Sequence, residues 1–199
     1  MLSGWGVHIY DYDNDGIKDL FLANGHVMDN IQVSQPHLRY KQKPVLLKRV
    51  GKKFQDVSAV SGEVFQQVWP SRGAAFGDLD NDGDIDVVVS NCNEPAYVLR
   101  NEGGNRQHWV ALELKGHTSN RDGIGAKLKL TTESGKVQYN LVTTTASYLS
   151  ANDRRVFFGI GAEAKIKEIE IVWPGGHKQI VVNPKVDQFL KVEEDTGKS

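Results

Sequence analysis

Two short stretches of the chain concentrate its carboxylates. Residues Asp11–Asp19 and Asp78–Asp86 both follow the pattern D-x-D-x-D-G-x-x-D. Two carboxylates about 4 Å apart repel each other by roughly 4 kcal/mol at an effective dielectric of about 20, so a group of them must bind protons or a cation. The glycine at the sixth position permits the sharp turn that would curl each stretch around a centre.

The pattern predicts that each stretch is a loop that binds one calcium ion. Oxygen ligands select a hard cation, and Ca²⁺ is favoured over Mg²⁺ because Mg²⁺ prefers a rigid octahedron and keeps much of its own water. The expected ligands are the carboxylates at positions one, three, five and nine and the main-chain carbonyl at position seven. These are Asp11, Asp13, Asp15, Asp19 and Ile17 in the first loop, and Asp78, Asp80, Asp82, Asp86 and Asp84 in the second.

Two other interpretations of the acidic loops compete with calcium binding. Asp, Asn and Gly also mark ordinary tight turns, but two copies with the same carboxylate spacing favour metal loops. An EF-hand would need Glu at position twelve and flanking helices. Position twelve is Leu22 in one loop and Val89 in the other, and the apolar runs after both loops are typical of buried strands.

The sequence offers little to an enzyme mechanism. The histidines form no pair at metal-ligand spacing, G-x-S-x-G is absent, and Cys92 is the only cysteine. Carboxylates that hold calcium have depressed pKa values and are poor proton carriers. We therefore expect the protein not to be an enzyme.

Charge and hydropathy argue against nucleic-acid binding and against a membrane span. The net charge is −1 across 199 residues, and the basic residues of the second half are scattered along alternating strands, so we expect no nucleic-acid binding. No apolar run is long enough to span a membrane. The first residues, Met1–Trp5, lack the basic region and apolar core of a signal peptide.

The first half of the chain is a tandem repeat. Apolar runs around each acidic loop predict strands, at residues 6–10, 19–23, 45–49 and 54–57 in the first unit and 73–76, 86–89 and 97–100 in the second. Four antiparallel strands per unit, with the acidic loop between the first two, would make a blade of a β-propeller. The sequence thus predicts an all-β protein that begins with a partial propeller.

The second half predicts a β-sandwich. Short alternating or apolar segments give seven strands, at residues 109–114, 126–130, 137–142, 156–158, 166–173, 179–182 and 189–192. We expect two blades over residues 1–105, the sandwich over 106–194 and a tail over 195–199. The strand at Trp109 could alternatively complete the second blade, which blurs the boundary near residue 105.

Two local features of the second half have a functional and a structural interpretation. Asp122-Gly123 could belong to a ligand loop, but a single carboxylate makes no metal site, so a turn is favoured. The Trp173–Gly176 stretch could form an aromatic platform for a sugar. A strand end and hairpin turn, with Trp173 covering the core, is the favoured interpretation.

These segments resemble two known families. Residues Trp5–Gly16 and Gly73–Val89 resemble FG-GAP/VCBS repeats, the blades of integrin-type propellers, in which the Asp-rich loop binds Ca²⁺ on one rim. Residues Asn105–Gly116, Ser119–Lys127 and Val172–Gly176 resemble the ASPIC/UnbV domain, which follows such repeats in the cartilage acidic protein-like family. The ligands implied by the first resemblance are the residues already chosen from their spacing.

The resemblances and the loops together predict a function. We expect a calcium-binding, non-catalytic extracellular interaction or adhesion module, located outside the cell, in the periplasm or on the cell surface. The partner would be an extracellular protein or polysaccharide. An accessory or carbohydrate-binding part of a secreted enzyme is the alternative. Two blades cannot close a ring, so further upstream blades or self-association are also expected.

Overall fold

The fold is all-β, as the sequence predicts. A computed structural model describes residues 1–195, with 47% of the chain in strands and 7% in helices. Four sheets are present in the described residues, and antiparallel pairing dominates them. Within the same residues no helix is long and apolar enough to cross a membrane.

The first sheet contains the first acidic loop. Its strand order follows the chain, with antiparallel neighbours. The strands are β1 (Gly4–Tyr10), β2 (Asp19–Asn24), β3 (Val45–Val50) and β4 (Lys53–Asp56). A segment between β2 and β3 carries a single helical turn, α1 (Ile31–Ser34), which the sequence did not predict. The expected four-stranded first unit is therefore present.

The second sheet has three strands, where four were expected. They are β5 (Ser71–Gly77), β6 (Asp86–Asn91) and β7 (Glu94–Leu99), after the 3₁₀ turns η1 (Ser58–Val60) and η2 (Glu63–Gln66). The alternative in which the strand at Trp109 completes this sheet is wrong, because that strand pairs within the C-terminal sheets. Pro95 lies in β7 and has no N–H to donate, which suits an edge strand.

The two N-terminal sheets pack through their first strands. Gly6 of β1 lies so close to β5 that an added Cβ would be 2.7 Å from the Ala74 Cβ. Next to this contact, the Phe76 ring lies 5.0 Å from the Tyr10 ring and 5.7 Å from the Phe21 ring, measured between centroids. This shared aromatic core fixes the relative position of β1 and β5, and hence of the two loops that follow these strands.

The C-terminal half is the predicted sandwich of seven strands. After the 3₁₀ turn η3 (Gly104–Arg106), β8 (His108–Lys115), β11 (Val156–Gly161) and β14 (Gln188–Glu193) form one sheet in the order β11-β8-β14. The other sheet is β10-β9-β12-β13, built from β9 (Lys127–Thr132), β10 (Val137–Leu141), β12 (Ile166–Val172) and β13 (Lys178–Val182). We call β8–β14 the C-terminal sandwich.

The sandwich core confirms two local predictions. Ile169 and Ile171 of β12 are fully buried, whereas Glu168 and Glu170 on the opposite face are partly exposed. Trp173 is buried in the same core, and its Nε1 donates a hydrogen bond of 3.0 Å to the Gln179 side chain. The expected turn at Asp122-Gly123 is also present. Residues 196–199 of the predicted tail lie outside the described part of the chain.

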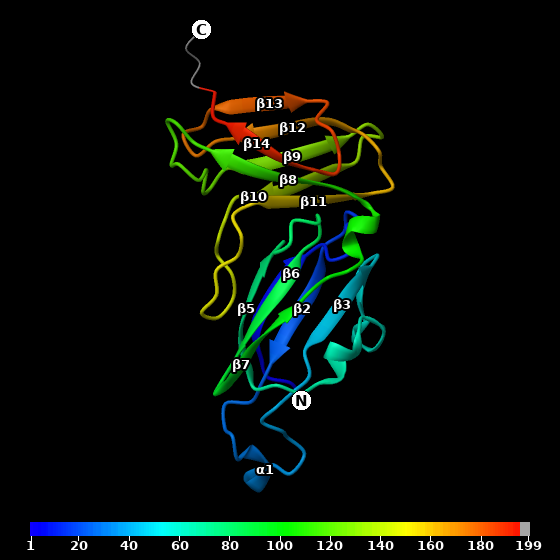
Figure 1. Ribbon diagram of the computed structural model, residues 1–199, viewed down its shortest axis with the longest axis vertical. Coiled ribbons are helices and arrows are strands. Elements are labelled where there is room, and N and C mark those ends of the chain that lie inside the picture. The colour runs from blue at the N-terminus through cyan, green and yellow to red at the C-terminus, as the bar shows by residue number, and fades with distance from the viewer. Residues whose placement is uncertain (196–199) are drawn as a thin grey trace.

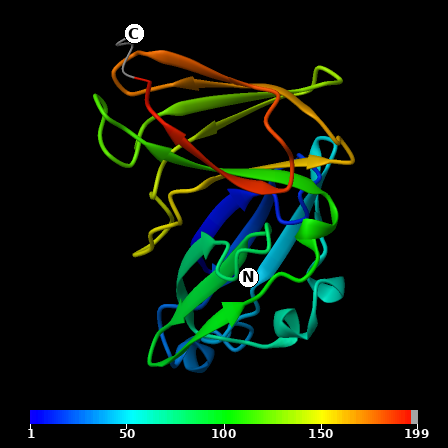
Figure 2. The same ribbon diagram turned by 45° about the horizontal axis from the view of Figure 1, so that its top comes forward.

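The C-terminal sandwich lies against one end of the N-terminal sheets, as Figures 1 and 2 both show. The β10–β11 connection, yellow in Figure 1, extends down beside β5. Its Ser147 hydroxyl donates to the Trp5 carbonyl at 2.6 Å, and the Phe76 main chain exchanges hydrogen bonds with Asn152 and Asp153. The covered end is the one that carries the two acidic loops.

Candidate metal centres

The two acidic loops have the same backbone conformation. The first loop (Asp11–Asp19) joins β1 to β2, and the second loop (Asp78–Asp86) joins β5 to β6. In each loop the fourth residue is an asparagine with positive φ, 54° for Asn14 and 60° for Asn81. Asparagine tolerates this left-handed region better than most residues. The sixth residue of each loop is the expected glycine, also with positive φ.

The first aspartate of each loop is held by the loop's own backbone. Asp11 accepts hydrogen bonds from the main-chain N–H groups of Asp15 at 3.1 Å and Gly16 at 2.8 Å. Asp78 accepts the equivalent bonds at 3.2 and 2.9 Å. These bonds curl the chain around the carboxylate, so the turn that the glycine permits is formed in both copies.

The last aspartate of each loop is tied to a neighbouring strand. Asp19 accepts a hydrogen bond of 2.7 Å from the Arg49 main-chain N–H. Asp86 accepts the corresponding bond, 2.8 Å long, from Asn101. Arg49 and Asn101 are therefore equivalent positions of the two repeats, and each fixes one end of its loop.

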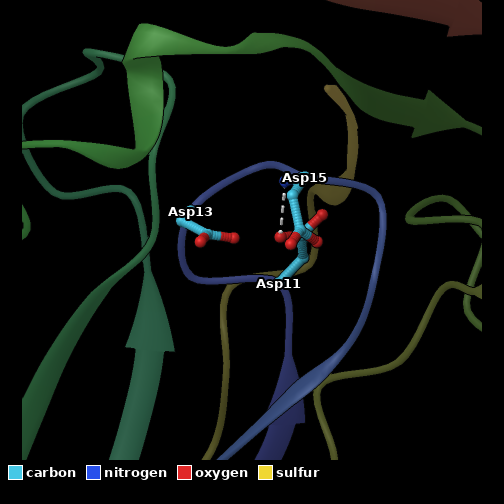
Figure 3. Close-up of side chains that lie close together, drawn as sticks. All are labelled: Asp11, Asp13 and Asp15. Atoms are coloured by element: carbon cyan, nitrogen blue, oxygen red, sulfur yellow. Dashed lines mark hydrogen bonds between the residues drawn. The ribbon is translucent and has the colours of Figure 1, made fainter. Parts of the chain in front are cut away.

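Three carboxylates converge in each loop. One oxygen each from Asp11, Asp13 and Asp15 lies within 4.8 Å of the others, and the same holds for Asp78, Asp80 and Asp86. In Figure 3, Asp13 enters from one side of the curled first loop, and Asp11 and Asp15 lie on the other side. The structure therefore brings together three of the four predicted carboxylates in each loop.

The other predicted ligands are placed differently. Asp82 accepts hydrogen bonds from the Asp84 main-chain N–H at 3.2 Å and the Asn105 side chain at 2.9 Å. Asp19 is fully buried and lies outside the three-carboxylate group. The predictions for Ile17 and Asp84 concern their main-chain carbonyls, and calcium ligation by either stays a prediction.

Unpartnered buried oxygens test whether these residues fit a cation. Among the described residues, Asp13 Oδ1, Asp19 Oδ2 and Asp84 Oδ1 are buried carboxylate oxygens with no hydrogen-bond partner. A buried acceptor without a partner costs about 1–3 kcal/mol, and more when it is charged. Two of the three belong to the predicted ligand set of the first loop. The donor set therefore fits a hard cation.

The environment of the loop carboxylates disfavours their charged forms. Burial raises the pKa of Asp11 to about 7, and the nearby Asp15 and Asp13 carboxylates add to this effect. Burial likewise raises the pKa of Asp19 to about 6 and that of Asp84 to about 7. Each of these three groups therefore holds a proton at a pH where an ordinary aspartate is ionised.

A basic side chain at equivalent positions of the two repeats contacts the third residue of each loop. Lys48 of β3 precedes Arg49, and its Nζ contacts Asp13 Oδ2 and lies 3.0 Å from Asp15 Oδ2. Arg100 precedes Asn101, and its Nε lies 2.6 Å from Asp80 Oδ2. Burial lowers the pKa of Lys48, but hydrogen bonds to Asp13 and Asp15 outweigh it and raise the pKa above its usual value.

Sequence reasoning missed these two basic residues. The sequence did mark both positions, because Lys48 and Arg100 each lie near the end of an apolar run that a polar turn follows. Their contacts with the loop aspartates could not be predicted without knowing the strand register. The ammonium of Lys48 already offsets part of the negative charge of the first loop, and a metal ion would have to compete with it.

Comparison with known proteins finds a family match in the C-terminal half. A protein-family model described as ASPIC and UnbV matches residues 116–199. The match begins directly after β8, so it covers most of the C-terminal sandwich and leaves out both acidic loops. The expected resemblance of this half to the ASPIC/UnbV domain is confirmed, and that of the N-terminal half to FG-GAP/VCBS repeats stays a prediction.

Similar curated proteins share one name. Cartilage acidic protein 1 of Homo sapiens is 23% identical over 147 residues, which make up 68% of this chain and 22% of that protein. The protein from Mus musculus is 22% identical over 139 residues, covering 66% and 21% of the two chains. The one from Xenopus tropicalis is 23% identical over 133 residues, covering 62% and 20%. The chain thus spans about a fifth of the length of these relatives.

Proposed function

We propose that the protein is a calcium-binding, non-catalytic extracellular interaction module. One observation carries the calcium assignment: two copies of one acidic pattern adopt the same curled backbone, and each gathers three carboxylates within 4.8 Å. Ca²⁺ accepts six to eight oxygen ligands in flexible geometry, which suits such loops. Calcium supplies charge neutralisation here, and the carboxylates supply orientation through their backbone hydrogen bonds.

The similar proteins support an extracellular location. Their name, cartilage acidic protein 1, refers to a tissue rich in extracellular matrix. Extracellular modules bind calcium with dissociation constants of about 10⁻⁴–10⁻³ M, which free calcium outside cells can satisfy. The partner that this module would recognise is an extracellular protein or a polysaccharide.

We further propose that the N-terminal sheets are FG-GAP/VCBS propeller blades that other blades complete. Val7 and Ile9 alternate on β1 with the side chains that face β5, and they are 43% and 56% exposed. A neighbouring blade, or a second copy of the chain, would cover them. Sedimentation of this chain alone should show self-association through this face. A chain that stays monomeric at high concentration would contradict the proposal that the face needs a partner.

Calorimetric titration tests the calcium assignment. We expect the wild-type chain to bind two calcium ions and to bind Mg²⁺ much more weakly. The variants Asp13→Ala and Asp80→Ala should each lose one equivalent, because each removes a carboxylate from one cluster. Asp122→Ala is the control, since this partly exposed carboxylate lies in a sandwich turn and contacts Arg154. Two equivalents retained in both loop variants would contradict the assignment.

We expect the Lys48 side chain of the wild-type protein to weaken calcium binding at the first loop. Replacing it in Lys48→Met removes an ammonium that calcium must displace from Asp13 and Asp15. A hydrogen bond to a charged group contributes about 1.5–3 kcal/mol, so we expect calcium affinity at this loop to rise about tenfold or more. Arg49→Met is the matched control, because it removes the same charge from the next residue, whose side chain points to the Gly51 carbonyl. Unchanged or weaker binding in Lys48→Met would show that Lys48 does not compete with the ion.

A further inference from the structure

Asn14 connects three parts of the molecule. Its side-chain Nδ2 donates hydrogen bonds to the Gly83 carbonyl at 3.0 Å and to the Gly104 carbonyl at 3.1 Å. Its own main-chain carbonyl accepts a bond of 2.8 Å from the Gly161 N–H. A residue of the first loop thus contacts the second loop, the segment before β8 and the end of β11.

Asn81, the equivalent residue of the second loop, has no such role. Both asparagines occupy the fourth position and have nearly the same φ. Asn14 is 2% exposed, whereas Asn81 is exposed and its side-chain oxygen accepts a hydrogen bond from Arg155. The difference between these matched positions lies in what the side chain contacts, because the backbone conformation is shared.

The contacts of Asn14 depend on the conformation of both loops. Asn14 lies between Asp13 and Asp15, two of the carboxylates that converge in the first loop. Gly83 lies between Asp82 and Asp84 of the second loop, and its N–H is bound to the Asp78 carboxylate. A cation that fixes the curl of one loop therefore fixes one partner of the Asn14–Gly83 hydrogen bond.

The energetic consequence is a coupling between the loops. A buried donor or acceptor that loses its partner destabilises the folded state. When one loop is ordered by its cation, this hydrogen bond favours the ordered form of the other loop. By thermodynamic linkage each site must then raise the affinity of the other by the same factor.

We propose that Asn14 is a positioning residue that makes calcium binding at the two loops positively cooperative. The proposal rests on the calcium-binding function proposed above and adds a regulatory property to it. Coupling between sites typically changes affinity by about 5- to 150-fold. The module would therefore respond to calcium over a narrower concentration range than two independent sites allow.

Calcium titrations of the full chain and two variants test the proposal. Asn14→Gly removes the side chain at a positive φ that glycine readily adopts, and Asn81→Gly makes the same change in the second loop. We expect the wild type and Asn81→Gly to bind the second ion at least about fivefold more tightly than independent sites would. Asn14→Gly should bind two ions independently.

A double-mutant cycle separates coupling from a structural role. Asp80→Ala disables the second site, and it should weaken calcium binding at the first loop in the wild type but not in Asn14→Gly. A purely structural role of Asn14 would lower thermal stability and leave this cycle additive. Two independent sites in the wild type, or equal loss of cooperativity in Asn81→Gly, would overturn the coupling and leave calcium binding intact. A wild-type chain that binds no calcium would refute both proposals.

Discussion

Gly83→Ala is expected to be among the most destabilising single substitutions in the chain. A Cβ at this position would lie 1.9 Å from Trp109 Cε2, well inside contact distance, and Gly83 also has a φ of +99°. Trp109 is buried in β8 and cannot move without displacing the sandwich from the second loop. We expect a loss of about 4 kcal/mol or more in the free energy of unfolding, the range of exceptional core defects.

Two glycine controls separate the clash from backbone strain. Gly135→Ala changes a residue with φ of +89° and open space around it, so it measures the cost of backbone strain alone, about 1–3 kcal/mol. Gly16→Ala changes the equivalent glycine of the first loop, where the nearest atoms are 3.3 Å away. Denaturant unfolding of the three variants should give the largest loss for Gly83→Ala. Equal losses would show that the sandwich does not press on the second loop.

Calcium should raise thermal stability strongly, and more so at higher pH. Each site at about 100 times its dissociation constant adds about 2.7 kcal/mol, so two sites should raise the melting temperature by roughly 10–20 °C in a chain of this size. In calcium-free buffer, Asp11 and Asp19 have folded-state pKa values of about 7 and 6, above their unfolded value of 3.8. The folded state then holds protons that the unfolded state has lost, so stability falls as pH rises from about 4 to about 7.

Melting curves at pH 5 and pH 8, with and without calcium, check this prediction. The calcium-induced shift should be larger at pH 8, where the cation-free loops are least stable. Asp11→Asn is a useful comparison, because a neutral amide removes the titrating group, so its cation-free form should depend less on pH. An equal calcium-induced shift in melting temperature at both pH values would mean that calcium does not neutralise the buried carboxylates.

Local patterns predicted most of the fold because burial on one face imposes them. The alternation of Ile169 and Ile171 with glutamates predicted β12, and all seven strands of the sandwich were found near their expected positions. The carboxylate spacing also predicted the curled loops, since Asp11 and Asp78 bind backbone groups that lie within their own loops. Such short-range interactions leave their signature in consecutive residues.

What the sequence could not predict depends on contacts between distant segments. The covering of the loops by the sandwich rests on pairs such as Trp109 with Gly83, and Arg155 with the Asp78 carbonyl at 2.5 Å. Trp109 looks from its own strand like an ordinary core residue. Asn14 and Asn81 are indistinguishable in the repeat pattern, and only the packing of the sheets on one another brings Asn14 into contact with Gly83, Gly104 and Gly161.

The missing fourth strand of the second sheet has a similar explanation. The repeat predicted equal units, but the chain after β7 leaves that sheet through η3, and β8 pairs in parallel with β14. The affinity of a strand for one sheet or another depends on partners far along the chain. Periodicity therefore predicted that residues 109–114 form a strand without predicting which sheet they join.

The most direct measurement is a structure from crystals grown in millimolar calcium. Anomalous difference maps should come from data collected at a long X-ray wavelength, where the anomalous signal of calcium is strong. The account predicts two strong peaks, one among Asp11, Asp13 and Asp15 and one among Asp78, Asp80 and Asp86, with Lys48 displaced from the first. Water alone at both positions, with Lys48 and Arg100 still bound to the loop carboxylates, would contradict it.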